Sequence, residues 1–292
     1  METKWIDGKQ IAREVRAELK SQIAAYKEQG LPAPKLTVIL VGEDPASQIY
    51  VNNKTKACGW IGMESETLRM PEDTTEEELL RVIAERNADP AVNGILVQMP
   101  LPAGLSEERV LLAIDPAKDV DGFHPMNVGR MAVGDSEALV SCTPAGVIEL
   151  LKRSGIPISG KRCVVAGRSN IVGKPMARLL LAENGTVTVC HSRTSNMDEI
   201  LQEAEIFVAA VGRPKFFHGS QFREGTVIID VGIHRDENGI CGDVDFESCQ
   251  GIASYITPVP GGVGPMTIAM LLYNTLRSYE HQHGLSGGEK RA

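Results

Sequence analysis

Short, uninterrupted aliphatic runs alternate with helical patterns along most of this chain, and that alternation restricts its fold more than any other feature. The runs lack the polar alternation of half-exposed strands, so they are typical of strands buried on both faces. Three of them are KLTVILVG (35–42), VNGILVQMPL (92–101) and KRCVVAG (161–167). Between such runs, apolar residues at helical spacing predict helices, the first over residues 9–29. A strand–helix–strand order predicts an α/β fold with a parallel sheet.

The alternation is most regular in the second half of the chain. Its predicted order is strand, helix, strand, helix, strand and strand, which indicates a Rossmann-like, doubly wound parallel sheet. The irregular stretch 115–142 is long for a connection within one domain. We therefore expect two α/β domains with a cleft between them. The first takes residues 1–142 and a C-terminal helix at about 265–284, and the second takes residues 143–264.

The composition narrows the classes of protein and partner. Hydrophobic residues make up 42% and charged residues 23%, as in ordinary globular proteins. A net charge of -8 argues against nucleic acid as a partner, since such proteins carry a basic face. No segment approaches the roughly 20 apolar residues that cross a membrane. The six cysteines show no CxxC spacing and the six histidines no ligand cluster, so we expect free thiols and no metal.

The two ends of the chain carry their own indications. METKWIDGKQ at the start has no apolar run typical of a signal peptide, so we expect a cytoplasmic protein. The Gly-rich, polar stretch 285–292 is expected to be a disordered tail.

A glycine-rich turn follows the strand at 161–167. It reads GRSNIVGK, in which Gly167 and Gly173 enclose RSNIV and a helix begins. Backbone N–H groups at such a helix start bind phosphate, although the middle glycine of G-x-G-x-x-G is missing here. The turn, with Arg168 and Ser169 in it, therefore indicates a dinucleotide site. A plain strand–helix turn is the alternative.

The next predicted strand ends in CHSRT (190–194) and bears on the choice of cofactor. Proteins that prefer NAD place an acid about 20 residues past the glycines, on the ribose hydroxyl, and this stretch has none. Ser192 and Arg193 suit a ribose 2′-phosphate and Arg168 is placed to assist, because a guanidinium binds phosphate through two N–H groups. These residues favour NADP over NAD. A solvated surface arginine is the alternative for Arg193.

Polar residues of the first half also stand at positions typical of a site. Tyr50 and Lys54 are four residues apart in a predicted helix, so they share one face. Gln98 ends a strand, where α/β proteins bind ligands, and Asp121 lies in DVDGFHP. A local hydrogen bond for Gln98 and a turn or cap for Asp121 are the alternatives. TPVPGGVGPMT (257–267) is either a loop that approaches a flat ligand or a rigid linker.

Short-chain dehydrogenases also use tyrosine and lysine at this spacing, with the tyrosine as proton donor. Their glycine-rich turn lies N-terminal to the pair, within one domain. Here Lys54 precedes Gly167 by more than a hundred residues. This order excludes a short-chain dehydrogenase and predicts that the pair belongs to the substrate side of the cleft, facing the nicotinamide.

Five motifs fall in the order found in one enzyme family. They are EDPASQIYVNNKTKACGWIGM (43–63), GILVQMPLP (94–102), DPAKDVDGFHP (115–125), GRSNIVGKP (167–175) and TPVPGGVGPMT (257–267). Over nearly its whole length the chain resembles the bifunctional methylenetetrahydrofolate dehydrogenase/methenyltetrahydrofolate cyclohydrolase family. The resemblance implies a folate substrate, NADP, a homodimer and a place in one-carbon metabolism and purine biosynthesis. Ser141 departs from the proline that the family often has before CTP, which concerns loop stiffness rather than chemistry.

The resemblance also implies roles for single residues. Lys54 would be the central catalytic residue, with Tyr50 as its partner. Gln98 would tune the lysine, and Asp121 would anchor the pterin ring. The positions that match cofactor contacts are Gly167, Arg168, Ser169, Ser192 and Ile233. The loop beside the folate would be Pro260, Gly261 and Gly262.

Two consecutive reactions follow from the resemblance. Hydride leaves 5,10-methylenetetrahydrofolate for NADP, and water then opens the ring of 5,10-methenyltetrahydrofolate to give 10-formyltetrahydrofolate. The second step needs a proton acceptor and a proton donor, work that a lysine of lowered pKa does. One alternative is another two-domain NADP oxidoreductase, which leaves the polar set of the first half unexplained. The other is a non-catalytic nucleotide sensor on the same fold.

Overall fold

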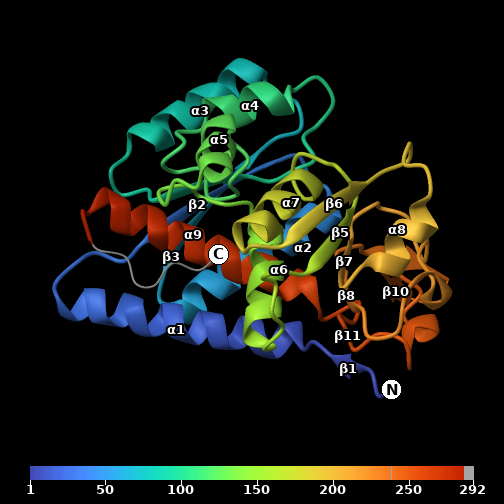
Figure 1. The fold of residues 1–292 in the computed structure, drawn as a ribbon. Coiled ribbons are helices and arrows are strands. Elements are labelled where there is room, and N and C mark those ends of the chain that lie inside the picture. Colours follow the sequence, from blue (N-terminus) through green and yellow to red (C-terminus); the bar gives the residue numbers. More distant parts are fainter. Residues whose placement is uncertain (238, 286–292) are drawn as a thin grey trace. The chain divides into compact units, whose positions relative to one another are not determined.

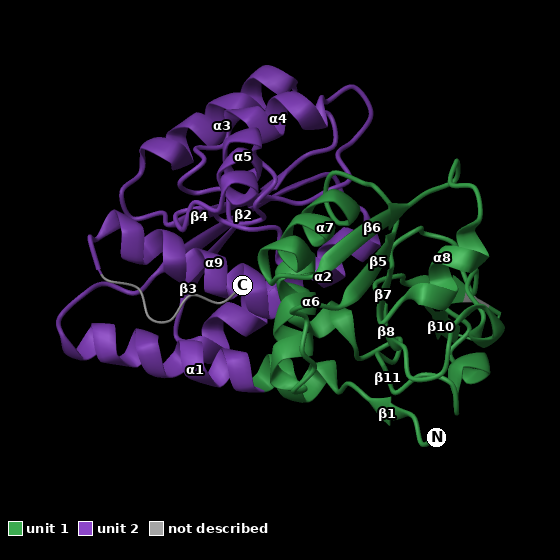
Figure 2. Cartoon of the chain, in the orientation of Figure 1, with its two compact units in different colours: residues 1–13, 143–267, 291–292 green, residues 14–142, 268–290 purple. Residues whose placement is uncertain are grey.

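The chain forms two compact units, which Figure 2 shows in green and purple. The computed structural model describes residues 1–237 and 239–285. Unit 1 comprises Met1–Arg13 and Thr143–Thr267; unit 2 comprises Glu14–Cys142 and continues from Ile268. All of the expected tail except residue 285 lies outside the described residues. The predicted cleft between the domains stays a prediction.

Unit 1 is built on a parallel six-stranded sheet of order β1-β11-β8-β7-β5-β6 (Figure 1). The strands are β1 (Lys4–Trp5), β5 (Arg162–Ala166), β6 (Thr186–Cys190), β7 (Ile206–Ala209), β8 (Val227–Asp230) and β11 (Tyr255–Ile256). β7 and β8 are buried along their whole length, as their aliphatic runs predict. The predicted Rossmann-like parallel sheet is confirmed.

The order in which strands are added to the unit 1 sheet reverses at β5. β6 pairs with one edge of β5, and β7 pairs with the other. Such a topological switch point is where open α/β sheets bind ligands, beyond the carboxyl ends of the strands. The glycine-rich turn leaves β5 at this end, so the sheet order alone marks the turn as a ligand site.

The remaining elements of unit 1 are mostly short. The helices are α6 (Cys142–Arg153, which begins in unit 2), α7 (Gly173–Ala182) and α8 (Met197–Glu203), with 3₁₀ turns η1 (Gly219–Gln221) and η2 (Glu247–Cys249). The antiparallel hairpin of β9 (His234–Asp236) and β10 (Gly239–Cys241) was not predicted. The sequence predicts residues 1–13 to be part of the first domain, but in the structure they cluster with unit 1. The reason is that β1 pairs with β11.

Unit 2 holds a smaller parallel sheet of order β3-β2-β4. Its strands are β2 (Lys35–Val41), β3 (Glu64–Met70) and β4 (Gly94–Val97). Its helices are α2 (Pro45–Ile61), α3 (Glu76–Ala88), α4 (Glu107–Ala113) and α5 (Pro125–Val133), with most of α1 (Gly8–Glu28) and α9 (Val263–Gln282). β2 is central and almost wholly buried, as its aliphatic run predicts. No helix among the described residues has the length and apolar character to span a membrane.

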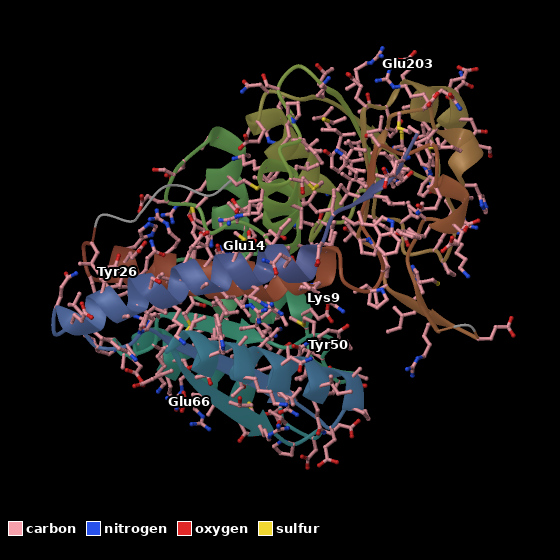
Figure 3. All side chains as sticks on the ribbon, turned by 90° about the horizontal axis from the view of Figure 1, so that it is seen from below. Lys9, Glu14, Tyr26, Tyr50, Glu66 and Glu203 are labelled. Carbon is pink, nitrogen blue, oxygen red and sulfur yellow. The ribbon has the colours of Figure 1, made fainter. Side chains whose placement is uncertain are left out.

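Within unit 2, α1 contacts α9 through a partly buried hydrogen bond and a pair of aromatic rings. The hydroxyl of Tyr26, labelled in Figure 3, donates to Glu280 Oε1 at 2.8 Å, and its ring lies 5.8 Å from that of Tyr279. Burial, followed by the hydrogen bond to Glu280, raises the pKa of Tyr26 to about 12. The end of α9 is therefore held against α1, and Asn274, on an earlier turn of α9, reaches the loop that carries Asp121.

Candidate active site

Helix α2 carries the predicted pair of Tyr50 and Lys54. Asp44 caps its start, where Asp44 Oδ2 accepts a hydrogen bond from the backbone N–H of Ser47 at 2.7 Å. The helix ends at Gly62, whose φ of 83° is the left-handed conformation that favours glycine. Tyr50 projects from α2 with 49% of its surface exposed (Figure 3), whereas Lys54, one turn later, is half-buried. The structure places both side chains on one face, as their spacing predicts.

Lys54 contacts the residue that ends β4. Its Nζ donates to Gln98 Oε1 at 3.0 Å. The amide of Gln98 is held in this orientation because its Nε2 donates to the carbonyl of Met99 at 2.7 Å. Gln98 therefore makes a local hydrogen bond, which was the alternative interpretation of this residue from the sequence. Its side-chain oxygen also accepts a hydrogen bond from Lys54.

Asp121 lies close enough to Lys54 for their charges to interact. Burial raises the pKa of Asp121 to about 6, the charge of Lys54 opposes the rise, and Asp119 adds to it. Thus the structure brings together three of the four predicted residues, with Gln98 and Asp121 near one ammonium group. The fourth, Tyr50, stands one helical turn away.

The loop of Asp121 is held by residues that sequence reasoning missed. Buried Asp119 accepts hydrogen bonds from the backbone N–H of His124 at 2.8 Å and from Asn127 Nδ2 at 3.0 Å. Asn274 of α9 donates from Nδ2 to the carbonyls of Val120 and Val140, both at 2.8 Å. These contacts fix the backbone on both sides of Asp121.

The glycine-rich turn of unit 1 is closely packed. Gly167 has a φ of 126°, and a Cβ there would lie 2.1 Å from the carbonyl oxygen of Ala210. A Cβ at Gly173 would lie 2.3 Å from the carbonyl oxygen of Gly167. Ser169 Oγ accepts from the backbone N–H groups of Val172 and Gly173 at 3.2 and 3.3 Å, beside the start of α7. The turn can be built only with glycine at both positions, which fits close approach of backbone to a pyrophosphate.

The predicted phosphate-binding residues follow two neighbouring strands. Ala166 and Cys190 are paired at the ends of β5 and β6, and Arg168, Ser192 and Arg193 come directly after them, all exposed. The backbone N–H of Arg193 donates to His191 Nδ1 at 3.2 Å, which keeps this turn compact. Two guanidinium groups and a hydroxyl therefore follow the carboxyl ends of β5 and β6, and the turn after β6 has no acid. This set of groups fits a 2′-phosphate.

The remaining predicted residues lie on loops of unit 1. Ile233 follows β8 with 55% of its surface exposed. The backbone N–H of Gly262 donates to the carbonyl of Pro258 at 2.8 Å, and Gly261 accepts from the backbone N–H of Lys9 at 3.1 Å, while Pro260 is exposed. Within the ranges that the structure covers, no three His, Cys, Asp or Glu side chains form a group able to hold a metal ion. All six cysteines are buried thiols that form no disulfide bond.

Comparison with known families gives two matches to this chain. A model described as the catalytic domain of tetrahydrofolate dehydrogenase/cyclohydrolase matches residues 6–121, and one described as the NAD(P)-binding domain of the same enzyme matches residues 141–283. The chain belongs to the tetrahydrofolate dehydrogenase/cyclohydrolase family. The predicted family resemblance is therefore confirmed.

Individual relatives agree over the full length. The bifunctional protein FolD of Acetivibrio thermocellus is 56% identical, across 97% of this chain and 99% of its own. The solved FolD structure from Campylobacter jejuni has a TM-score of 0.93 at 45% identity and covers 96% and 99%. The Trypanosoma brucei enzyme, solved with NADP cofactor and an inhibitor, has a TM-score of 0.90 at 38% identity and covers 96% and 98%.

Family membership confirms the predicted class of enzyme. The chain is a bifunctional methylenetetrahydrofolate dehydrogenase and cyclohydrolase with an NAD(P)-binding domain, and NADP is supported as its cofactor. A non-catalytic nucleotide sensor and a dehydrogenase of another substrate class no longer fit.

Proposed function

We propose that this chain oxidises 5,10-methylenetetrahydrofolate with NADP and then hydrolyses the methenyl product to 10-formyltetrahydrofolate, with Lys54 as the proton-handling residue. The observation that carries the proposal is the Lys54–Gln98 hydrogen bond beside Asp121, within the range of the catalytic-domain match. An assay that follows the methenyl intermediate with each cofactor tests it.

In the hydrolysis, water adds to the cationic methenyl carbon and loses a proton, after which one ring C–N bond breaks and its nitrogen gains a proton. Lys54 Nζ handles both protons: it gives one to the leaving nitrogen and takes one from the water. Gln98 Oε1, held by its own bond to Met99, receives one Nζ hydrogen and so orients the group. Tyr50, on the same helical face, keeps the lysine and substrate placed.

In the oxidation, orientation of the two reactants matters more than acid–base help. Bound NADP supplies the hydride acceptor. Gly167 and Gly173 would let the backbone of the turn come close to its pyrophosphate, with Ser169 at the same turn, and Arg168, Ser192 and Arg193 would bind the 2′-phosphate. Ile233 and the loop of Pro260, Gly261 and Gly262 would contact cofactor and folate.

Asp121 is proposed to anchor the pterin, because an ionised carboxylate accepts hydrogen bonds from ring and amino N–H groups. With a pKa of about 6, it is protonated below that pH and an acceptor above it. The KM for folate should therefore fall as pH rises from about 5 to about 7, and Asp121→Asn should remove this dependence. A pH series of initial rates for both proteins checks it, and an Asn variant that keeps the wild-type profile would contradict it.

We propose that the chain works as a cytoplasmic homodimer, as the family resemblance implies. β6 is at the edge of the unit 1 sheet, and its Val189 is 38% exposed. An unpaired strand edge with exposed β-branched residues is a ready surface for pairing with a second copy. Light scattering should give twice the mass of the chain, and a monomeric mass at all concentrations would count against the dimer.

A further inference from the structure

Asp243 is a wholly buried carboxylate to which the chemistry above gives no role. It follows β10, has 0% of its surface exposed, and accepts four hydrogen bonds. Oδ2 accepts from the backbone N–H groups of Val211 at 2.6 Å and Gly212 at 3.0 Å. Oδ1 accepts from the backbone N–H of Arg213 at 2.9 Å and contacts His234 Nε2 at 2.7 Å. Four donors around one carboxylate make a site organised around negative charge.

The donors come from two separate loops. Three consecutive N–H groups turned toward an anion form a backbone nest, here by the segment after β7. Because an ionised carboxylate only accepts hydrogen bonds, His234 Nε2 must carry the proton in the fourth contact. His234 is the first residue of β9 and comes just after the loop that follows β8, the strand next to β7 in the sheet. Asp243 thus joins the carboxyl ends of two neighbouring strands, where α/β proteins bind ligands.

The loop after β7 also supports the glycine-rich turn. Ala210, one residue before the nest, donates from its N–H to the carbonyl of Ala166 at 2.8 Å. Its carbonyl oxygen lies where a Cβ of Gly167 would come within 2.1 Å. On the other loop, Ile233 directly precedes His234. The Asp243 carboxylate therefore fixes the positions of two groups: the Ala210 backbone that packs against the glycine-rich turn, and the exposed Ile233.

A second buried carboxylate holds Asp243 itself. Asp230, at the end of β8, accepts from the backbone N–H groups of Asp243, Val244 and Gly232, each at 2.9 Å. A Cβ at Gly232 would lie 2.4 Å from Asp243 Oδ1, so the loop has no room to move aside. The position of the Asp243 carboxylate is thereby fixed from both sides.

We propose that Asp243 is a positioning residue for the NADP site: through the nest of Val211–Arg213 and through His234 it holds the two loops that shape this site. The proposal rests on the proposed function only in taking NADP as the ligand. Asp243 itself touches no reacting atom. Its removal should weaken cofactor binding and spare the chemistry of Lys54.

The test uses the full chain and the isosteric variant Asp243→Asn, whose amide presents a donor to groups that are themselves donors. Calorimetric titration with NADP should show a rise in Kd of about tenfold or more. Hydrolysis of methenyltetrahydrofolate without cofactor should keep at least half of its rate. The control is Thr226→Val, which removes a buried hydroxyl bonded to the carbonyl of Ala204 at the opposite end of the sheet. It should lower thermal stability and leave Kd unchanged.

A second pair of variants decides the matter if Asp243→Asn does not fold. His234→Gln keeps an N–H donor near the Nε2 position and should retain the wild-type Kd for NADP, whereas His234→Phe loses the donor and should raise it. An unchanged Kd in Asp243→Asn or His234→Phe would overturn the proposal. So would a parallel loss of hydrolysis and NADP binding, which indicates a general structural role. Because binding is measured directly, failure of the proposed reaction in the wild type would be seen separately.

Discussion

Lys54→Met should lose cyclohydrolase activity by roughly 10²–10⁴-fold, the contribution typical of a positioned proton-transfer group. Methionine keeps the length and packing of the half-buried stem but has no group to exchange protons with water or the leaving nitrogen. Hydride transfer should fall much less, since it depends on orientation. Separate assays of the two half-reactions measure the split.

Lys56→Met is the matched control on the same helix. Lys56 is exposed and points away from the Tyr50–Lys54 face, so its loss should leave both activities at wild-type level.

Lys54→Met should also raise the pKa of Asp121 above about 6, because the lysine charge holds it down. Full cyclohydrolase activity in Lys54→Met would remove the lysine from the proposed mechanism.

Arg193→Ala should lower kcat/KM for NADP by roughly 10–100-fold and leave kcat/KM for NAD unchanged. The estimate corresponds to one charge-assisted hydrogen bond, worth about 1.5–3 kcal/mol. NAD lacks the 2′-phosphate, so kcat/KM for NAD should not depend on Arg193. Initial rates at varied concentration of each cofactor give the ratio.

Arg162→Ala serves as the control for Arg193→Ala. Arg162 begins β5 and lies at the opposite end of the strand from the glycine-rich turn, near Glu203 and Glu205. Its removal takes away the same charge without touching the cofactor end of the sheet. Equal losses with NADP and NAD in Arg193→Ala would contradict the assignment of a 2′-phosphate contact.

The parallel sheet could be predicted because its central strands are buried on both faces. Their sequences are therefore continuous aliphatic runs, which no other common element requires. β1 could not be predicted in the same way. Its two residues, Lys4 and Trp5, are exposed and pair with Tyr255 and Ile256 some 250 positions away. α5 was hidden in the irregular stretch 115–142, where His124 and Gly134 cap a helix of only nine residues.

The candidate site was predictable where local spacing carries chemistry. Tyr50 and Lys54 share a helical face by sequence separation alone, and Gln98 marks a strand end. Asp243 and Asn274 were missed because they bind backbone groups that are distant in sequence. Nearly every residue carries the same backbone N–H and C=O groups, so the sequence does not show which of them a distant side chain binds.

One active chain should carry out both folate reactions, with NADP as the hydride acceptor of the first. The most direct measurement follows the absorbance of methenyltetrahydrofolate after methylenetetrahydrofolate is added to the purified protein with NADP, and separately with NAD. We expect the intermediate to form fastest with NADP and then to decay at a rate that rises with enzyme concentration. No intermediate with either cofactor, or an intermediate that accumulates and decays only at the rate seen in buffer, would contradict it.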